Sequence, residues 1–145
     1  MSVLIVIPAR FASSRYPAKP LAQLKGATGT SRSLIRRSWD AAMSVNGADR
    51  VVVATDDVRI ADHAAAFGAE VVMTAESCRN GTERCAEAHD RLGGGYEIVV
   101  NLQGDAPLTP ACCGPHRPVP RRTYRVIRVI STRQRRDFVR WRSVR

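Results

Sequence analysis

The chain contains few cysteines and no long hydrophobic run. Its cysteines fit neither the C-x-x-C spacing of zinc sites nor a disulfide framework; the four are Cys78, Cys85, Cys112 and Cys113. No apolar run approaches the length of a membrane span, and the N-terminal run 3–7 is too short for a signal peptide. These absences predict a reduced, cytoplasmic protein with no membrane partner.

Two glycine-rich phosphate motifs are also absent. The sequence contains neither G-x-x-x-x-G-K-[ST] nor G-x-G-x-x-G, which argues against P-loop NTPases and the common dinucleotide-binding proteins. Instead, the apolar run 3–7 leads into a loop with three cations, Arg10, Arg15 and Lys19. A buried parallel strand followed by such a loop is typical of a phosphate site at the carboxyl edge of an α/β sheet. The arginines can bind a triphosphate through paired donors and the lysine as a point charge, although a basic surface loop is the alternative.

The net charge of +10 lies entirely in the last part of the chain. Residues 1–111 carry 12 Lys and Arg against 12 Asp and Glu, whereas residues 112–145 carry 11 Arg against Asp137 alone. Any attraction to nucleic acid or to an anionic surface is therefore a property of the C-terminal segment, where Phe138 and Trp141 among the arginines are able to stack on bases.

Residues 112–145 also lack Lys, Glu, Leu and Ala, and show strand alternation only from 124 to 130. Two explanations are open: an evolved basic arm, or translation of a GC-rich gene out of frame. We favour the second, because the composition changes abruptly inside a recognisable motif region. We therefore expect a truncated product in which residues 1–111 form one partial nucleotide-binding domain and residues 112–145 add nothing to its sheet.

Strands and helices alternate along the first 111 residues. Strands are expected at 3–7, 49–55, 70–73 and 97–102, and helices at 34–45, 56–67 and 80–92. Ser33 would cap the first helix, and Asn80 would cap the third with Glu83 as its capping-box partner. The inner face of the first helix is expected to carry Leu34, Ser38, Ala41 and Val45. The alternation predicts an α/β fold, with a mainly parallel sheet and helices on both faces.

Several helical residues have a structural alternative to a functional role. Asp56 or Asp57 is expected to cap the second helix. Asp56 has a second possible role, in lining a base pocket, and we favour the cap. Arg59 is expected on the exposed face of that helix, where its removal should matter little. Cys85 and His89 lie at i and i+4, and we expect them to pack on the sheet rather than to share a metal.

Asp105 follows the fourth expected strand, as the cationic loop follows the first. Both would lie at the carboxyl edge of the sheet, so this acid would face the phosphate-binding cations across a divalent metal. Mg²⁺ suits such a place, since it is held by one or two carboxylates plus substrate phosphates. From spacing alone, a Gly-Asp turn before Pro107 is an equally good explanation.

Three motifs taken together resemble one enzyme family. They are the loop 8–21, Asn80-Gly81-Thr82-Glu83-Arg84 and Val100-Asn101-Leu102-Gln103-Gly104-Asp105-Ala106-Pro107-Leu108. In this order they resemble the 3-deoxy-manno-octulosonate (Kdo) cytidylyltransferases, also called CMP-Kdo synthetases, over about the N-terminal half of that family's usual chain. The resemblance implies a Rossmann variant like that of the nucleotide-diphospho-sugar transferases. It also implies transfer of CMP from CTP to Kdo, with release of pyrophosphate, for lipopolysaccharide precursor synthesis.

The resemblance further implies roles for single residues. The nucleotide contacts would be Pro8, Ala9, Arg10, Ser13, Arg15, Lys19, Arg84 and Gln103. Gln103 would also contact Kdo, and Asp105 would bind Mg²⁺ as the cofactor. Arg10, Lys19 and Asp105 would be catalytic, through positioning and charge neutralisation during in-line displacement at the α-phosphorus.

Two features depart from the family pattern. Ala106 stands where the family usually has Glu, and the segment 27–32 is a few residues longer than the family's turn. The family resemblance suggests a homodimer for full-length relatives.

Two other functions stay open. One is a catalytically impaired nucleotide-binding fragment, and the other is a nucleic-acid-binding module that depends on residues 112–145 and weakens steeply with salt.

Overall fold

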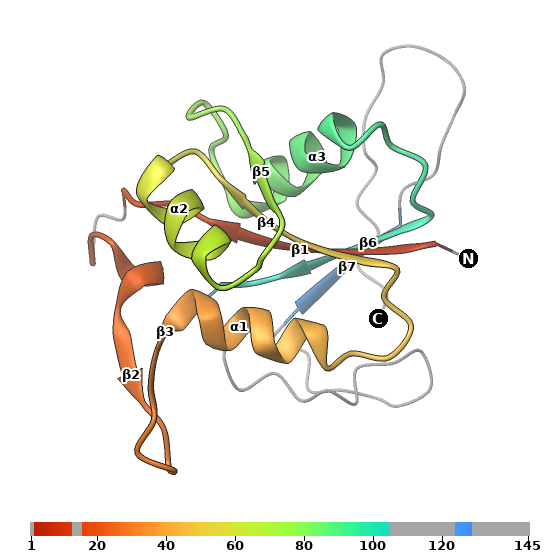
Figure 1. Ribbon diagram of the computed structural model, residues 1–145. Helices are drawn as coiled ribbons and strands as arrows, with labels where there is room; N and C mark the ends of the chain where they lie inside the picture. The colour runs from red at the N-terminus through yellow and green to blue at the C-terminus, as the bar shows by residue number, and fades with distance from the viewer. Residues whose placement is uncertain (1, 13–15, 105–123, 129–145) are drawn as a thin grey trace.

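A five-stranded sheet lies at the centre of the structure, a computed structural model in which residues 2–12, 16–104 and 124–128 are described (Figure 1). The strand order is β5-β4-β1-β6-β7; the first four are parallel to one another, and β7 runs antiparallel to β6. The mainly parallel α/β sheet expected from the sequence is therefore confirmed. The strands are β1 Val3–Ala9, β4 Arg50–Thr55, β5 Val71–Met73, β6 Ile98–Leu102 and β7 Tyr124–Arg128.

The central strand β1 is buried on both faces. Leu4 and Val6 belong to one core cluster, and Ile5 and Ile7 belong to the other. Successive side chains of a strand point to opposite faces. A strand covered on both faces is therefore a continuous apolar run, and not an alternating one.

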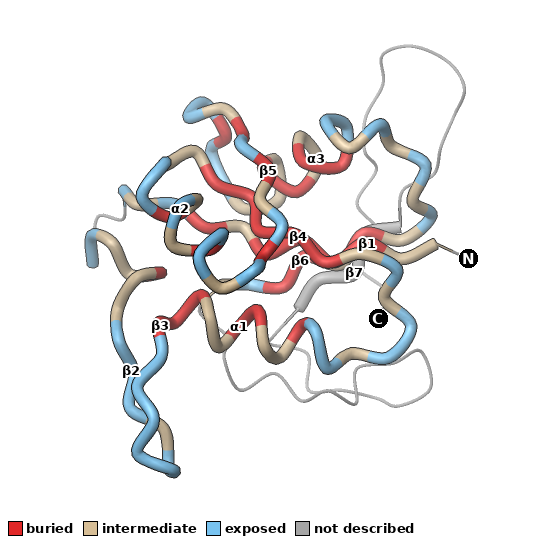
Figure 2. The backbone as a smooth tube through the Cα atoms, viewed as in Figure 1, coloured by how far each residue is buried: buried red, intermediate tan, exposed pale blue. Residues whose placement is uncertain are grey.

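Helices cover both faces of the sheet, as the sequence predicts. α1 (Leu34–Met43) and α2 (Val58–Ala66) pack on the face that carries Ile5, and α3 (Gly81–Arg91) packs on the face that carries Leu4. Buried residues follow the strands and the sides of the helices turned toward them (Figure 2). None of the described helices combines the length and the apolar character needed to cross a membrane.

The buried face of α1 differs from the expected one. Ala41 and Val45 are only partly buried, and the helix ends at Met43. The inner face is rotated toward Ile35 and Trp39, because burying these large side chains removes more apolar surface from water than burying an alanine does. The buried residues of α1 are Leu34, Ile35, Ser38, Trp39 and Ala42.

Two of the expected helix caps are present. The Ser33 hydroxyl accepts the N–H of Arg36 at 3.3 Å, and the Asn80 side chain accepts the N–H of Glu83 at 3.0 Å. The expected capping box differs in one bond: the Glu83 carboxylate accepts the N–H of Arg79 at 2.9 Å, one residue before the cap, in place of the N–H of Asn80. Donors that would be unpaired at the start of each helix thus gain acceptors.

Residues 124–128 add a strand, so the expectation that the C-terminal segment contributes nothing to the sheet was wrong. Tyr124 pairs with Leu102, and Arg128 pairs with Ile98. The outer edge of β6 would otherwise present unpaired N–H and C=O groups, which is a template for another strand. The short alternation within 124–130 therefore outweighed the unusual composition around it.

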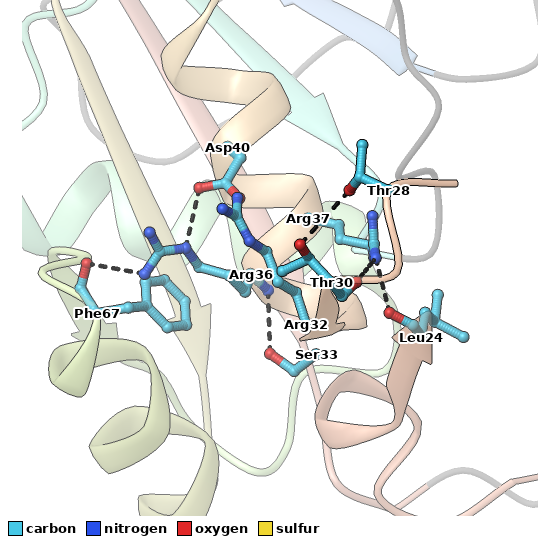
Figure 3. A network of polar contacts seen from close by, with 9 residues as sticks. All are labelled: Leu24, Thr28, Thr30, Arg32, Ser33, Arg36, Arg37, Asp40 and Phe67. Carbon is cyan, nitrogen blue, oxygen red and sulfur yellow. Dashed lines mark hydrogen bonds and ion pairs between the residues drawn. The ribbon is translucent and has the colours of Figure 1, made fainter. Parts of the chain in front are cut away.

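A short helix and a hairpin connect β1 to α1, and the sequence did not predict either. They are the 3₁₀ helix η1 (Lys19–Leu21) and the antiparallel pair β2 (Gln23–Lys25) and β3 (Ser31–Ser33). Arg37 of α1 donates to the carbonyl oxygens of Leu24 at 2.7 Å and Thr30 at 3.0 Å (Figure 3). One guanidinium thereby holds both sides of the hairpin, which contains the long 27–32 segment.

We expect Ser33→Ala to lower the free energy of unfolding by about 1–2 kcal/mol. The α1 helix would lose its cap, and Nε2 of His63 would lose a partner 2.7 Å away. Urea denaturation followed by circular dichroism measures the change. Ser31→Ala, at an exposed serine of the same strand, is the control and should cost less than about 0.5 kcal/mol. Equal losses in the two variants would contradict the capping role.

Candidate nucleotide-binding site

Three chain segments meet at the carboxyl edge of the sheet. A Cβ placed on Gly81, the first residue of α3, would lie 3.1 Å from Cγ of Pro8 and 3.7 Å from Nε2 of Gln103. A Cβ on Gly104 would lie 3.2 Å from the carbonyl oxygen of Pro8. Glycine therefore permits the end of β1, the start of α3 and the segment after β6 to approach one another closely. The fold thus brings together the three motifs of the sequence.

Arg10 lies beside the N-terminus of α3. It is exposed, and its Nη1 donates to the carbonyl oxygen of Arg79 at 3.5 Å, one residue before the helix cap. The N-terminus of a helix carries unpaired N–H groups and a partial positive charge, so it favours anions. Ala9, just before Arg10, is buried and pairs with Thr55 of β4. A cation and a helix N-terminus therefore flank the end of β1.

Lys19 stands at the far end of the same loop, as the first residue of η1. Ala18 before it adopts the left-handed conformation, with φ of 57°. Its N–H donates to the carbonyl oxygen of Phe11 at 3.0 Å. This bond brings the residue before Lys19 next to the residue after Arg10, so the two ends of the loop are joined.

Gln103 lies just beyond β6 and is exposed. Its Nε2 donates to Oδ1 of Asn101 at 3.0 Å, and Asn101 is itself 1% exposed. The following residue, Gly104, has its carbonyl oxygen bound by the hydroxyl of Ser38 at 2.9 Å. A buried asparagine and a buried serine thus orient the segment that carries the exposed amide.

Arg84 is buried inside the protein, with a side chain that is 2% exposed. Its Nη2 donates to Oδ2 of Asp56 at 2.9 Å, and its Nη1 donates to the hydroxyl of Thr74. Of the two expected caps of α2, Asp57 is the one present, accepting the N–H of Arg59 at 2.9 Å. The cap role favoured for Asp56 was therefore wrong. A buried guanidinium needs a countercharge, and Asp56 supplies it. A direct nucleotide contact by Arg84 stays a prediction.

A contact between the cationic loop and α2 was missed in the sequence. The guanidinium carbon of Arg59 lies 3.3 Å from the ring centroid of Phe11. Arg59 is 59% exposed, as expected, yet it is not remote from the loop. It also donates to both oxygens of Asp57, at 2.9 and 2.6 Å, and these bonds hold the pKa of Asp57 below its usual value. No local pattern marks this pair, because the two residues are distant in sequence.

Cys78 is a buried thiol that forms a hydrogen bond with Glu87 of α3. Its Sγ donates to one oxygen of Glu87 at 2.9 Å, while the other oxygen accepts the N–H of Ala75 at 2.9 Å. Burial, and then the hydrogen bond to Glu87, raise the pKa of Cys78 to about 11. Burial likewise raises the pKa of Cys85 to about 12. Both groups are therefore neutral thiols near pH 7, and Cys78 fixes the segment before α3.

Within the described ranges, no group of three or more His, Cys, Asp or Glu side chains is arranged to hold a metal ion. Cys85 packs in the core cluster of Leu4, and the His89 ring contacts the ring of Tyr96, with centroids 6.2 Å apart. The expected packing on the sheet is confirmed for Cys85, whereas His89 is buried against Tyr96, just before β6. Three of the expected site residues lie outside the described part of the chain: Ser13, Arg15 and Asp105.

A model of the cytidylyltransferase family matches residues 4–112. The chain belongs to the cytidylyltransferase family. It is 56% identical to the 3-deoxy-manno-octulosonate cytidylyltransferase of Maricaulis maris over 110 aligned residues. The alignment covers 76% of this chain and 40% of the relative. The chain is 52% identical over 106 residues to the mitochondrial 3-deoxy-manno-octulosonate cytidylyltransferase of Arabidopsis thaliana, covering 73% of this chain and 35% of the relative. The chain thus spans less than half the length of these two curated relatives.

Solved structures of cytidylyltransferases have the same fold. CMP:2-keto-3-deoxy-manno-octonic acid synthetase complexed with CTP matches with a TM-score of 0.69 at 37% identity, covering 77% of this chain and 43% of that chain. A cytidylyltransferase from Leptospira borgpetersenii matches with a TM-score of 0.60 at 25% identity. This match covers 77% of this chain and 44% of the other chain. The α/β fold expected from the sequence is therefore that of known cytidylyltransferases.

We expect Arg84→Met to lower the free energy of unfolding by about 3–5 kcal/mol, because it leaves the Asp56 carboxylate without its buried partner. Urea denaturation measures this loss. In the control, Arg79→Met, the replaced side chain is 85% exposed, and the cost should stay under about 0.5 kcal/mol. If Arg84→Met does not fold, the double variant with Asp56→Leu should recover part of the stability, since it removes both charges. A small loss for Arg84→Met alone would contradict its structural role.

Cys78 should make stability fall at alkaline pH. Its pKa is raised from 9.0 to about 11, so between these values the folded state keeps a proton that the unfolded chain releases. The free energy of unfolding then decreases as pH rises through this window, by up to roughly 2–3 kcal/mol. Cys78→Ala lacks this contribution, so the stability difference between the unaltered chain and the variant should shrink from pH 8 to pH 10.5. Urea denaturation at several pH values measures it, and a constant difference would refute the prediction.

Proposed function

We propose that this chain binds CTP at the carboxyl edge of its sheet and takes part in the transfer of CMP to Kdo, with release of pyrophosphate. One observation carries the proposal. Pro8, Gly81 and Gln103, from three separate motifs, lie against one another in a chain that is 56% identical to a Kdo cytidylyltransferase over 110 residues. A ligand that spans these motifs has to lie at this edge of the sheet.

The loop after β1 is proposed to hold the triphosphate. Arg10 and Lys19, with Arg15 between them in sequence, would bind its oxygens and balance the charge that develops on the leaving pyrophosphate. Pro8, Ala9 and Ser13 would line the nucleotide, and the N-terminus of α3 adds a partial positive charge beside Arg10. Gln103, exposed beyond β6, is proposed to contact both the nucleotide and Kdo.

The reaction is an in-line displacement at phosphorus. The anomeric hydroxyl oxygen of Kdo forms a bond to the α-phosphorus of CTP. The bond between the α-phosphorus and the oxygen that joins it to the β-phosphorus breaks, and pyrophosphate leaves with that electron pair. The hydroxyl proton passes to solvent water in the same step. Such a reaction depends mainly on positioning and charge neutralisation. Arg10 and Lys19 would supply both, and Asp105 would hold Mg²⁺, which would add positive charge beside the phosphates.

The described residues do not by themselves fit a Mg²⁺ site. Asp56 and Asp57, which follow β4 at the carboxyl edge, are bound by Arg84 and Arg59 respectively. The positive charge of the guanidinium beside each carboxylate would repel a second cation. Mg²⁺ binding is therefore proposed for Asp105 alone, and no chemical step is assigned to the metal.

Residues 1–111 are proposed as the nucleotide-binding unit of a cytoplasmic enzyme. The family match to residues 4–112 supports this boundary. The strand at 124–128 extends the sheet of this unit, although it lies outside the family match. A homodimer is proposed for the full-length relatives only.

We expect Arg10→Ala and Lys19→Ala each to weaken CTP binding by about 10- to 100-fold, because each removes a charge-assisted phosphate contact worth roughly 1.5–3 kcal/mol. Isothermal titration calorimetry measures the affinity. The matched control is Arg91→Ala, on α3, whose side chain is 52% exposed and pairs with Glu87. Arg59 is unsuitable as a control because it contacts Phe11. Equal effects of all three substitutions would refute the phosphate-loop assignment.

The function itself is tested with the full chain in two steps. Titration with CTP, UTP, ATP and GTP should show preferential binding of CTP. Pyrophosphate release is then measured with CTP, Kdo and Mg²⁺. Binding together with turnover supports the transferase. Binding without turnover identifies a nucleotide-binding fragment, which the short span relative to the curated relatives favours as the second candidate. Failure to bind CTP overturns the proposal.

A further inference from the structure

We propose that Arg59 and Phe11 form a brace that fixes both ends of the cationic loop, so that Arg59 is a positioning residue for the triphosphate. The inference rests on the proposed function for its ligand, but not for its geometry. It concerns a residue on α2, outside all three motifs that make up the candidate site.

The brace begins on a rigid element. Arg59 lies in the first turn of α2 and donates through Nε and Nη2 to the two oxygens of Asp57, at 2.9 and 2.6 Å. Asp57 is itself the cap of α2. Ile60 and Ala64 pack this helix against the sheet, and both are fully buried. The guanidinium plane is therefore held in place before it meets the loop.

The cationic loop contacts the Arg59 guanidinium through Phe11. The guanidinium carbon of Arg59 lies 3.3 Å from the centroid of the Phe11 ring, which is the distance of a stacked cation–π contact. Phe11 is partly buried and packs against the core cluster that contains Ile60. One face of its ring is thus covered by a fixed cation.

From Phe11 the constraint extends to both described cations of the loop. Arg10 precedes Phe11 directly. The Phe11 carbonyl oxygen accepts the N–H of Ala18 at 3.0 Å, and the Ala18 carbonyl oxygen accepts the N–H of Leu21 at 2.8 Å, which closes η1 around Lys19. A shift of Phe11 would therefore move the supports of Arg10 and Lys19 together.

Little of the fold depends on this contact, because Arg59 is 59% exposed and buries little apolar surface. Phosphate binding is more sensitive, since small displacements of binding groups cost affinity. The expected signature is a loss of triphosphate binding without a matching loss of stability.

The experiment compares Arg59→Ala with Arg91→Ala in the full chain. Both arginines are about equally exposed, lie on helices and pair with a carboxylate, but Arg91 is at the far end of α3. Three quantities are measured: hydrogen exchange of the Ala18 amide by NMR without ligand, affinities for CTP and for inorganic triphosphate, and the thermal unfolding midpoint.

Arg59→Ala should exchange the Ala18 amide about 10-fold faster and bind CTP and triphosphate each about 5- to 20-fold more weakly, with an unfolding midpoint close to that of Arg91→Ala. Arg59→Lys should fall between the unaltered chain and Arg59→Ala, because it keeps the charge and loses the planar stack. Phe11→Leu removes the ring from the same contact, so it should weaken CTP and triphosphate binding as Arg59→Ala does.

The brace is overturned if Arg59→Ala and Arg91→Ala exchange the Ala18 amide at the same rate. The positioning role is overturned if Arg59→Ala lowers the unfolding midpoint in proportion to its loss of affinity, or leaves both affinities unchanged. If the unaltered chain binds triphosphate but not CTP, the proposed function fails, and the affinities for triphosphate still decide the positioning role. If it binds neither ligand, the positioning role fails as well, and the exchange rate of Ala18 still decides whether the brace exists.

Discussion

The parallel pairing of β1 with β4 and β6 is the constraint on which the rest of the structure depends. Ala9 pairs with Thr55 on one side of β1, and Val6 pairs with Asn101 on the other. Because the three strands run in one direction, the segments that follow them leave the sheet at the same edge. This is why Arg10, Asp56 and Gln103, which are distant in sequence, all belong to one end of the molecule.

Arginine serves two purposes at that end. Arg84 and Arg59 are committed to carboxylates, at Asp56 and Asp57, and they hold the segment after β4 and the loop after β1 in place. Arg10, in contrast, is exposed and contacts a backbone carbonyl oxygen beside the N-terminus of α3. Paired arginines thus support the site, while the loop arginine is placed to meet an anionic ligand.

The sequence alone determined the elements that depend on local patterns. The apolar run from Val3 to Ile7 predicted a strand buried on both faces, and the capping residues Ser33 and Asn80 marked where two helices begin. Such signals are readable because period and capping chemistry act over a few neighbouring residues. The three motifs were readable for the same reason, and the family they indicated is confirmed over residues 4–112.

Only the tertiary structure decided which long-range partners each side chain found. Arg84 is buried and pairs with Asp56, a partner that the sequence did not indicate, although its position on the inner face of α3, four residues before Ala88, was a signal for burial. Arg59 was expected to be a simple surface residue, yet it stacks on Phe11. The strand at 124–128 was decided by the free edge of β6. In each case the deciding energy comes from a charge, a ring or a backbone edge that is distant in sequence, which no local pattern can specify.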